Sequence, residues 1–87
     1  MDRLTAKNKD GRYAIPDSSI EEAIQRLGLF EDAQEELFDS QKQIPKDLEA
    51  LRAEGKEKTV RYKEMMVQKL SNNNTVMFLE RHGISFQ

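Results

Sequence analysis

A heptad repeat runs through residues 20–44, IEEAIQRLGLFEDAQEELFDSQKQI. Its positions follow alternating spacings of three and four residues and are occupied by Ile20, Ala23, Leu27, Phe30, Gln34, Leu37, Gln41 and Ile44. Residues at this spacing lie along one side of an α-helix, and a largely apolar side is buried against a partner helix. The repeat therefore predicts a packed helix. Its two glutamines predict a partly polar seam, at which a second copy of the chain, forming a homodimer, is one candidate partner.

The composition restricts how so small a chain can be stabilised. Of its 87 residues, 37% are hydrophobic and 34% are charged, and there is no Cys and a single His. A domain of this size buries only about 60–65% of the surface of its unfolded chain, so disulfides, a metal or association often supply the missing stability. The residue content excludes disulfides and argues against a metal site. Association is left, and we expect no cofactor.

No part of the sequence predicts export or insertion into a membrane. The apolar runs fall far short of the roughly 20 residues that span a bilayer. The first residues, Met1-Asp2-Arg3-Leu4, lack the apolar stretch of a signal peptide. We therefore expect a full-length cytoplasmic protein without a membrane partner.

Residues 3–15 predict a short β-hairpin. Apolar and polar residues alternate on both sides of Asn8-Lys9-Asp10-Gly11, which has the composition of a turn. An isolated two-stranded hairpin is marginal in water, so we expect Leu4, Tyr13 and Ile15 to pack on helices.

The heptad repeat is expected to form a helix over residues 18–40. A capping box, made by Ser18 with Glu21 or by Ser19 with Glu22, favours its start. Residues 41–44 are expected to reverse the chain, because the proline that follows suits the first turn of a second helix.

The second helix is expected over residues 45–71, either continuous or bent into a pair at Gly55. The polar run 71–75 favours a cap or a turn, because Ser, Asn and Thr compete with the helical backbone for hydrogen bonds. A short last helix over 75–82 follows, and Gly83 suits a left-handed C-terminal cap.

These elements predict one mostly α domain over residues 1–87. It consists of a small N-terminal β-hairpin, an antiparallel pair of helices and a short C-terminal helix. The two long helices are expected to pack along the heptad stripe.

Charge is distributed unevenly along the chain. Residues 17–39 contain eight acids and one base, whereas residues 40–87 contain nine bases and six acids. A compact acidic helix can imitate nucleic-acid phosphates and occupy a basic groove on another protein, although a merely solvated surface is the simpler interpretation. The candidate partner-binding residues are Glu31, Asp32, Glu35, Glu36 and Asp39, with Phe38 as an apolar contact.

The second half of the chain offers an alternative surface for DNA or RNA. Its candidate residues are Arg52, Lys56, Lys58, Arg61, Lys63 and Lys69. Each neutralised phosphate adds to affinity, so nucleic-acid binding favours an uninterrupted positive stripe. Four acids, Glu49, Glu54, Glu57 and Glu64, interrupt this set, and two of them form i,i+4 pairs, Glu54 with Lys58 and Glu57 with Arg61. Direct binding of nucleic acid is therefore less favoured than a solvated surface of ion pairs.

The sequence disfavours catalysis and metal binding. The single histidine, His82, has no second His or Cys with which to share a metal, and its place near a helix end suits the helix dipole. Glycine-rich phosphate loops, nucleophile elbows and zinc motifs are absent. We expect no enzymatic activity.

Two groups of residues carry a resemblance to a known class of proteins. The first comprises Arg3-Leu4-Thr5, Gly11-Arg12-Tyr13-Ala14-Ile15-Pro16, Glu22-Ala23-Ile24-Gln25-Arg26-Leu27-Gly28 and Phe30-Glu31-Asp32. The second comprises Ile44-Pro45, Leu48, Leu51-Arg52, Gly55-Lys56-Glu57-Lys58-Thr59-Val60 and Phe78-Leu79-Glu80-Arg81-His82-Gly83-Ile84. Together they resemble small accessory proteins encoded by phages and prophages of Gram-positive bacteria. The resemblance implies a phage protein that acts in the cytoplasm of the bacterial host, and it assigns no catalytic or binding residue.

Two hypotheses for function follow. The first is a non-enzymatic phage protein that binds a host protein through the acidic helix, in its sharpest form an inhibitor of a bacterial defence nuclease of the anti-CRISPR kind. The alternative is a small phage regulator that binds DNA or RNA through the bases of residues 52–69.

Overall fold

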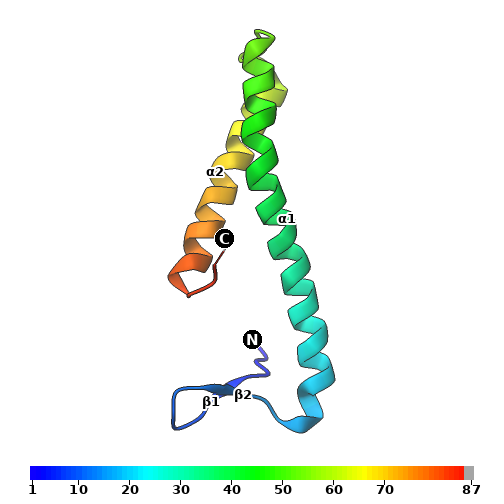
Figure 1. Ribbon diagram of the computed structural model, residues 1–87, viewed down its shortest axis with the longest axis vertical. Coiled ribbons are helices and arrows are strands. Elements are labelled where there is room, and N and C mark those ends of the chain that lie inside the picture. The colour runs from blue at the N-terminus through cyan, green and yellow to red at the C-terminus, as the bar shows by residue number, and fades with distance from the viewer. Residues whose placement is uncertain (86–87) are drawn as a thin grey trace. The chain divides into compact units, whose positions relative to one another are not determined.

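A β-hairpin and two long helices make up the fold (Figure 1). The structure is a computed structural model, and it describes residues 1–85. The elements are β1 (Ala6–Lys7), β2 (Tyr13–Ala14), a single 3-10 turn (Asp17–Ser19), α1 (Ile20–Ala53) and α2 (Val60–Arg81). The predicted mostly α fold with an N-terminal hairpin is confirmed. The chain divides into two compact units, Met1–Ala33 and Gln34–Gln87, and α1 continues from the first into the second.

The hairpin is built around its turn more than around its strands. Strands β1 and β2 are two residues each and pair antiparallel, Ala6 with Ala14 and Lys7 with Tyr13. The Asn8 side-chain oxygen accepts hydrogen bonds from the backbone N–H groups of Asp10 (3.0 Å) and Arg12 (3.1 Å). This side chain therefore folds the predicted turn by satisfying two backbone donors.

The predicted reversal at residues 41–44 is wrong, because α1 continues through Pro45 to Ala53. Proline has no N–H to give to the Gln41 carbonyl, so its place inside a helix carries a cost. Pro45 itself is exposed, whereas Ile44 beside it and Leu48 one turn later are buried. Burial of these two side chains offsets the lost hydrogen bond. The helix predicted over residues 18–40 therefore extends to Ala53.

Replacing Pro45 with Ala is expected to stabilise the protein by about 2 kcal/mol. An interior proline costs a helix about 3 kcal/mol, of which about 1 is returned because proline restricts the unfolded chain. Urea denaturation followed by circular dichroism measures the difference. Lys46→Ala, at an exposed neighbouring position of the same helix, serves as the control and is expected to change stability by less than about 0.5 kcal/mol. Equal stability of the wild type and Pro45→Ala would contradict an uninterrupted helix.

The reversal lies instead at Gly55. This glycine has φ +71°, in the left-handed region that side chains disfavour. The N–H of Lys56 donates to the Leu51 carbonyl (2.8 Å), and that of Gly55 donates to the Arg52 carbonyl (3.0 Å). These two bonds are the Schellman pattern that closes a helix C-terminus. The predicted helix over 45–71 is therefore two segments, the end of α1 and the start of α2.

A threonine cap begins α2. The Thr59 hydroxyl oxygen accepts a hydrogen bond from the Tyr62 N–H (3.3 Å) and donates one to the Lys56 carbonyl (2.7 Å). A capping side chain of this kind satisfies a backbone donor that the first helical turn leaves free. At α1 a 3-10 turn replaces the predicted capping box, and Pro16 before it supplies no side-chain cap.

The predicted break over residues 71–75 is also wrong, because α2 runs through it to Arg81 and includes the predicted last helix over 75–82. Two polar side chains in this run, those of Asn72 and Thr75, form hydrogen bonds within the fold. Asn72 is buried and donates to the Ser40 hydroxyl (2.8 Å), and the Thr75 hydroxyl donates to the Ser71 carbonyl one turn back (3.0 Å). Residues that favour turns in isolation are therefore held in a helix by tertiary contact.

The end of α2 confirms the predicted cap. Gly83 has φ +86°, its N–H donates to the Glu80 carbonyl (3.0 Å), and the Ile84 N–H donates to the Leu79 carbonyl (3.1 Å). Ile84 is half-buried, as the fold-back of a Schellman motif requires.

Within residues 34–85, α2 runs back along the second part of α1 (Figure 1). Three hydrogen bonds fix the antiparallel direction, because they join Arg52 to Tyr62, Ser40 to Asn72 and Gln34 to Ser85. The residues of α2 that are buried or half-buried also follow a heptad spacing: Tyr62, Met65, Lys69, Asn72, Val76 and Leu79. The partly polar seam predicted at Gln34 and Gln41 is therefore formed within one molecule, between α1 and α2.

Candidate functional site

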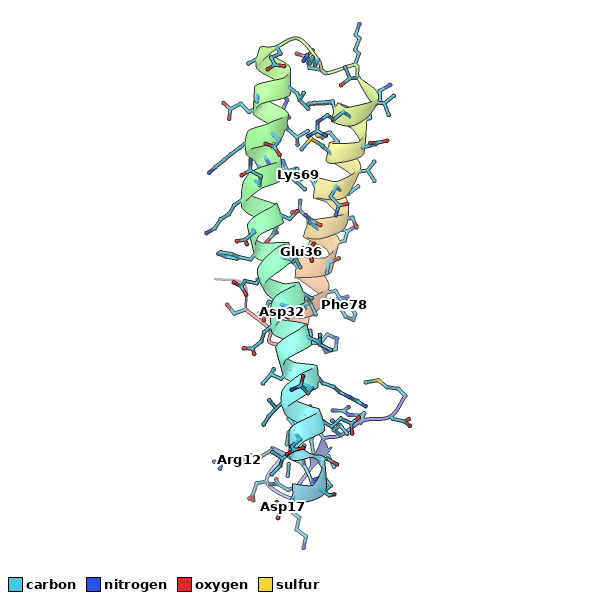
Figure 2. All side chains as sticks on the ribbon, turned by 90° about the vertical axis from the view of Figure 1, so that its right-hand side faces the viewer. Arg12, Asp17, Asp32, Glu36, Lys69 and Phe78 are labelled. Atoms are coloured by element: carbon cyan, nitrogen blue, oxygen red, sulfur yellow. The ribbon has the colours of Figure 1, made fainter. Side chains whose placement is uncertain are left out.

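The five predicted acids form one exposed surface on α1. They are Glu31, Asp32, Glu35, Glu36 and Asp39, and we call this set the acidic face. At 3.6 residues per turn they fall within an arc of about 140°. Figure 2 shows Asp32 and Glu36 along the same helix. Within residues 1–85 none of the five takes part in an ion pair, so the negative charge of this face is uncompensated by a direct contact.

Phe38 lies at the edge of the acidic face but offers less free surface than predicted. Its side chain is half-buried, and the Lys42 ammonium lies 4.1 Å from the ring centroid. A cation at this distance is attracted by the ring face and covers it. The Phe38 ring is therefore only partly available to a partner of the acidic face, because Lys42 covers one side of it.

The structure does not bring the predicted basic residues together. Arg52 donates to the Tyr62 hydroxyl (2.7 Å), and Lys56 pairs with Glu54 (2.9 Å). Lys58 lies in the connection between the helices. Of the other three, Lys63 lies on a different side of α2 from Arg61 and Lys69, because steps of two and six residues fall far from a whole number of helical turns. An uninterrupted positive stripe is absent from this set.

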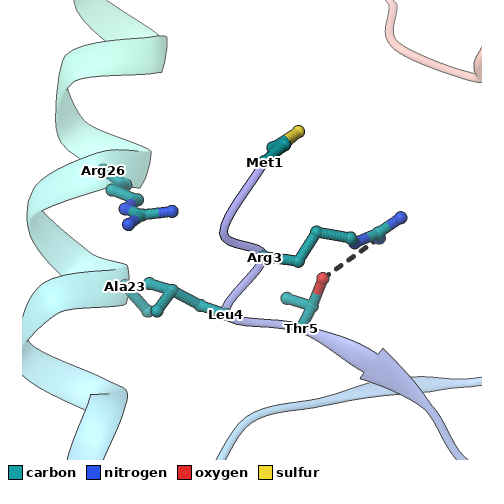
Figure 3. Close-up of a pocket in the computed structure, with 6 residues that line it drawn as sticks. All are labelled: Met1, Arg3, Leu4, Thr5, Ala23 and Arg26. Atoms are coloured by element: carbon teal, nitrogen blue, oxygen red, sulfur yellow. Dashed lines mark hydrogen bonds between the residues drawn. The ribbon is translucent and has the colours of Figure 1, made fainter.

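A pocket beside the N-terminal segment was not predicted. It is open, has a volume of about 250 Å³ and is lined by Met1, Arg3, Leu4, Thr5, Ala23 and Arg26 (Figure 3). The Arg26 guanidinium donates to the Asp2 carbonyl and to Glu22, both at 2.8 Å, and Arg3 donates to Thr5 (3.2 Å). Both cations are engaged, and the volume is below the roughly 300–1,000 Å³ of typical ligand sites. The hydrogen bond between Arg26 and the Asp2 carbonyl could not be predicted from the sequence, because it joins residues that are 24 positions apart and follows no periodic pattern.

A second, smaller cavity lies between the helices. Its volume is about 60 Å³, and its lining residues are Gln41, Ile44, Pro45, Lys69, Asn72 and Asn73. Asn72 at its wall is only 6% exposed, donates to Ser40 and accepts from the Gln68 amide (2.8 Å). The cavity is far too small for an organic ligand. It is a packing gap beside a satisfied polar group.

His82 forms the C-cap of α2, at the helix end where it was predicted. Its ring centroid lies 5.0 Å from that of Phe78, with the two rings tilted. Over residues 1–85 no group of three or more His, Cys, Asp or Glu side chains is placed to hold a metal ion.

None of the described helices combines the length and the apolar character that crossing a membrane requires.

Comparison with known proteins gives no family. No protein-family model matches the chain, and searches of curated proteins and of solved structures return no significant match. The resemblance to phage and prophage accessory proteins therefore stays a prediction, and the acidic face on α1 is the candidate functional site that the structure supports best.

Proposed function

We propose that this chain is a non-enzymatic phage or prophage accessory protein that binds a basic surface of a host protein through the acidic face. One observation carries the proposal: five exposed carboxylates on one side of α1, none of them in an ion pair within residues 1–85. Surface charge that is not compensated locally attracts a partner of opposite charge and speeds its association.

The spacing of these charges supports the sharper form of the proposal, an inhibitor that occupies the nucleic-acid site of a bacterial defence nuclease. Residues 31–39 span about 12 Å of helix, at 1.5 Å per residue. The five charges are separated by four intervals over this length, about 3 Å each on average, which lies between the 1.7 Å of duplex DNA and the 3.4 Å of one strand. A groove built for phosphates therefore meets a similar charge density on α1. The scattered bases of residues 52–69 offer no comparable stripe for the alternative regulator.

Reversing three charges of the acidic face is expected to abolish partner binding. The variant Glu35→Lys/Glu36→Lys/Asp39→Lys changes exposed positions only, so its helical circular dichroism should match the wild type. Tagged proteins are incubated with host lysate, with and without nuclease treatment, and the retained proteins are identified by mass spectrometry. We expect a host protein that survives nuclease treatment, is held by the wild type and is lost from the variant. The affinity of the purified host protein should fall at least 100-fold.

A matched control separates the acidic face from net charge. The variant Glu49→Lys/Glu57→Lys/Glu64→Lys makes the same change of charge at three other exposed acids. It should retain the host protein with an affinity within about threefold of the wild type. Equal binding by all three proteins would refute the proposal, and so would recovery that disappears whenever nucleic acid is digested.

A further inference from the structure

The segment before α1 is positively charged, in a chain whose net charge is −2. Residues 1–16 contain two acids, Asp2 and Asp10, and four bases, Arg3, Lys7, Lys9 and Arg12. All four bases are exposed, and within residues 1–85 none of them forms an ion pair. Surface cations without a local counter-charge attract an anionic partner. The acidic face shares no residue with this segment, so the segment is open to a role of its own.

Two of these cations lie against one exposed aromatic ring. Lys7 and Tyr13 are directly opposite each other on β1 and β2, so their side chains leave the hairpin on the same side. The Lys7 ammonium lies 5.4 Å from the centroid of the Tyr13 ring, and the Arg3 guanidinium lies 5.7 Å from it. Tyr13 is nevertheless 59% exposed. We call Arg3, Lys7 and Tyr13 the hairpin face.

The nearby acids do not neutralise the hairpin face. Asp10 lies in the turn and Asp2 lies before the first strand, and in the described part of the chain no carboxylate is paired with either cation of the face. Glu22 of α1 pairs with Arg26 instead (2.8 Å). Figure 3 shows the Arg3 side chain directed away from α1. The face therefore keeps its two positive charges beside a free aromatic surface.

The open pocket beside the N-terminal segment adjoins this face, because Arg3 belongs to both. Leu4 and Ala23 give the pocket apolar walls, and Thr5 adds a hydroxyl that is bonded to Arg3 (3.2 Å). Its volume of about 250 Å³ is small for a free ligand. A polymer that is held at several points needs only one of its units to enter such a pocket.

We infer that the hairpin face binds single-stranded nucleic acid, with one base stacked on Tyr13 and the adjacent phosphates held by Arg3 and Lys7. Proteins that bind single strands combine cations that follow the backbone with aromatic rings on which bases stack. Stacking of a base is stronger than a cation–π contact at an exposed site, so a base displaces a cation from the ring. The displaced cation is then beside the phosphate that follows the base.

The exposed ring favours a single strand over other anionic partners. A duplex keeps its base faces stacked inside, so it would use the two cations and leave Tyr13 without a partner. The acidic surface of a protein would likewise pair with Arg3 and Lys7 alone. A single strand uses all three residues, and the adjoining pocket gives the neighbouring base a place to lie.

The first experiment needs only the wild-type chain. Fluorescence anisotropy follows the binding of a labelled oligothymidylate of about 12 nucleotides, a length within the site sizes of single-strand binding domains. We expect a Kd between about 1 and 100 µM in about 50 mM NaCl. An abasic strand of the same length keeps every phosphate and should bind at least tenfold more weakly, because it has no base to stack. Oligouridylate of the same length tests whether RNA binds more tightly than DNA.

Two results would overturn the inference at this stage. The first is that neither oligothymidylate nor oligouridylate binds at protein concentrations up to about 500 µM, beyond the usual range of non-specific affinities. The second is that the abasic strand binds as tightly as oligothymidylate, which would reduce the interaction to charge alone.

Substitutions at Tyr13 test the stacking directly. Tyr13→Leu keeps an apolar side chain on the strand but removes the ring, so the affinity for oligothymidylate should fall at least tenfold. Tyr13→Phe keeps the ring and should stay within about threefold of the wild type. If Tyr13→Leu binds as the wild type does, no base stacks at this position. The comparison of intact and abasic strands remains decisive even where Tyr13→Leu disturbs the hairpin.

The cations are tested through the salt dependence of binding. Each phosphate contact to a single strand contributes about 0.7 to the slope of log affinity against log salt, so Arg3→Gln/Lys7→Gln should lower that slope by about 1.4. Lys46→Gln/Arg61→Gln is the matched control, since it removes one lysine and one arginine at exposed positions of the two helices and should leave the slope unchanged. Equal slopes for both double variants would overturn the assignment. All these variants keep the acidic face, so failure here is distinguishable from failure of host-protein binding.

Discussion

Leu48→Ala is expected to lower the free energy of unfolding by about 3 kcal/mol, within the 2–5 kcal/mol seen when a core leucine is truncated. Leu48 is 1% exposed and is the fully buried large side chain among residues 1–85. The change removes buried apolar surface and leaves a cavity that the two helices close only in part. A domain of this size has a total stability of about 5–10 kcal/mol, so the loss is a large share of it. Urea denaturation followed at 222 nm measures the effect.

Leu29→Ala is the matched control for this truncation. Leu29 lies on the same helix and is 70% exposed, so its removal should change stability by less than about 0.5 kcal/mol. The helix propensities of the two variants are the same, because both replace Leu with Ala. If both truncations lowered the free energy of unfolding by the same amount, Leu48 would not be buried between the two helices.

Asn72→Asp is expected to destabilise the protein by about 3 kcal/mol at pH 7, because it leaves a charge unpaired at a buried position. Asn72 is 6% exposed, donates to the Ser40 hydroxyl and accepts from Gln68. An aspartate has no amide N–H to donate, and its charged form is desolvated there. The exposed neighbour Asn73 gives the control, since Asn73→Asp should cost less than about 0.5 kcal/mol.

The cost of Asn72→Asp should depend on pH with a defined sign. Burial raises the pKa of the introduced carboxyl in the folded state above its unfolded value of about 4. The folded state then binds more protons than the unfolded state between these two pKa values, so stability falls as pH rises through that window. The difference from wild type should be small near pH 3 and full at pH 7, by urea denaturation at each pH. A difference that does not change with pH would contradict burial of this position.

The heptad repeat correctly predicted the first part of α1, because its spacing is a local property of the helix. It did not predict where the helix ends. Proline and glycine both disfavour a helix interior, and the sequence alone does not show that the helix tolerates Pro45 and ends at Gly55. Burial of Ile44 and Leu48 offsets the missing hydrogen bond at Pro45, whereas Gly55 takes a left-handed conformation that ends the helix.

The polar run of α2 shows the same limit. Its residues favour turns by local propensity, yet Asn72 is held in the helix by Ser40, which is 32 residues away in the sequence. A contact at that separation leaves no periodic signal. The acidic face, by contrast, was predictable in full, because charges at i and i+4 share a side of any helix that contains them.

The Ser40–Asn72 contact also has a consequence for synthesis of the chain. Asn72 is added 32 residues after Ser40, which takes about 2–6 s at a translation rate of about 5–20 residues per second. Throughout that interval the heptad side of α1 exists without the helix that later covers it. Until residue 72 has been added, Asn72 cannot hold α1 through Ser40, so the packed seam around Ile44 and Leu48 can form only after the first 72 residues have been made.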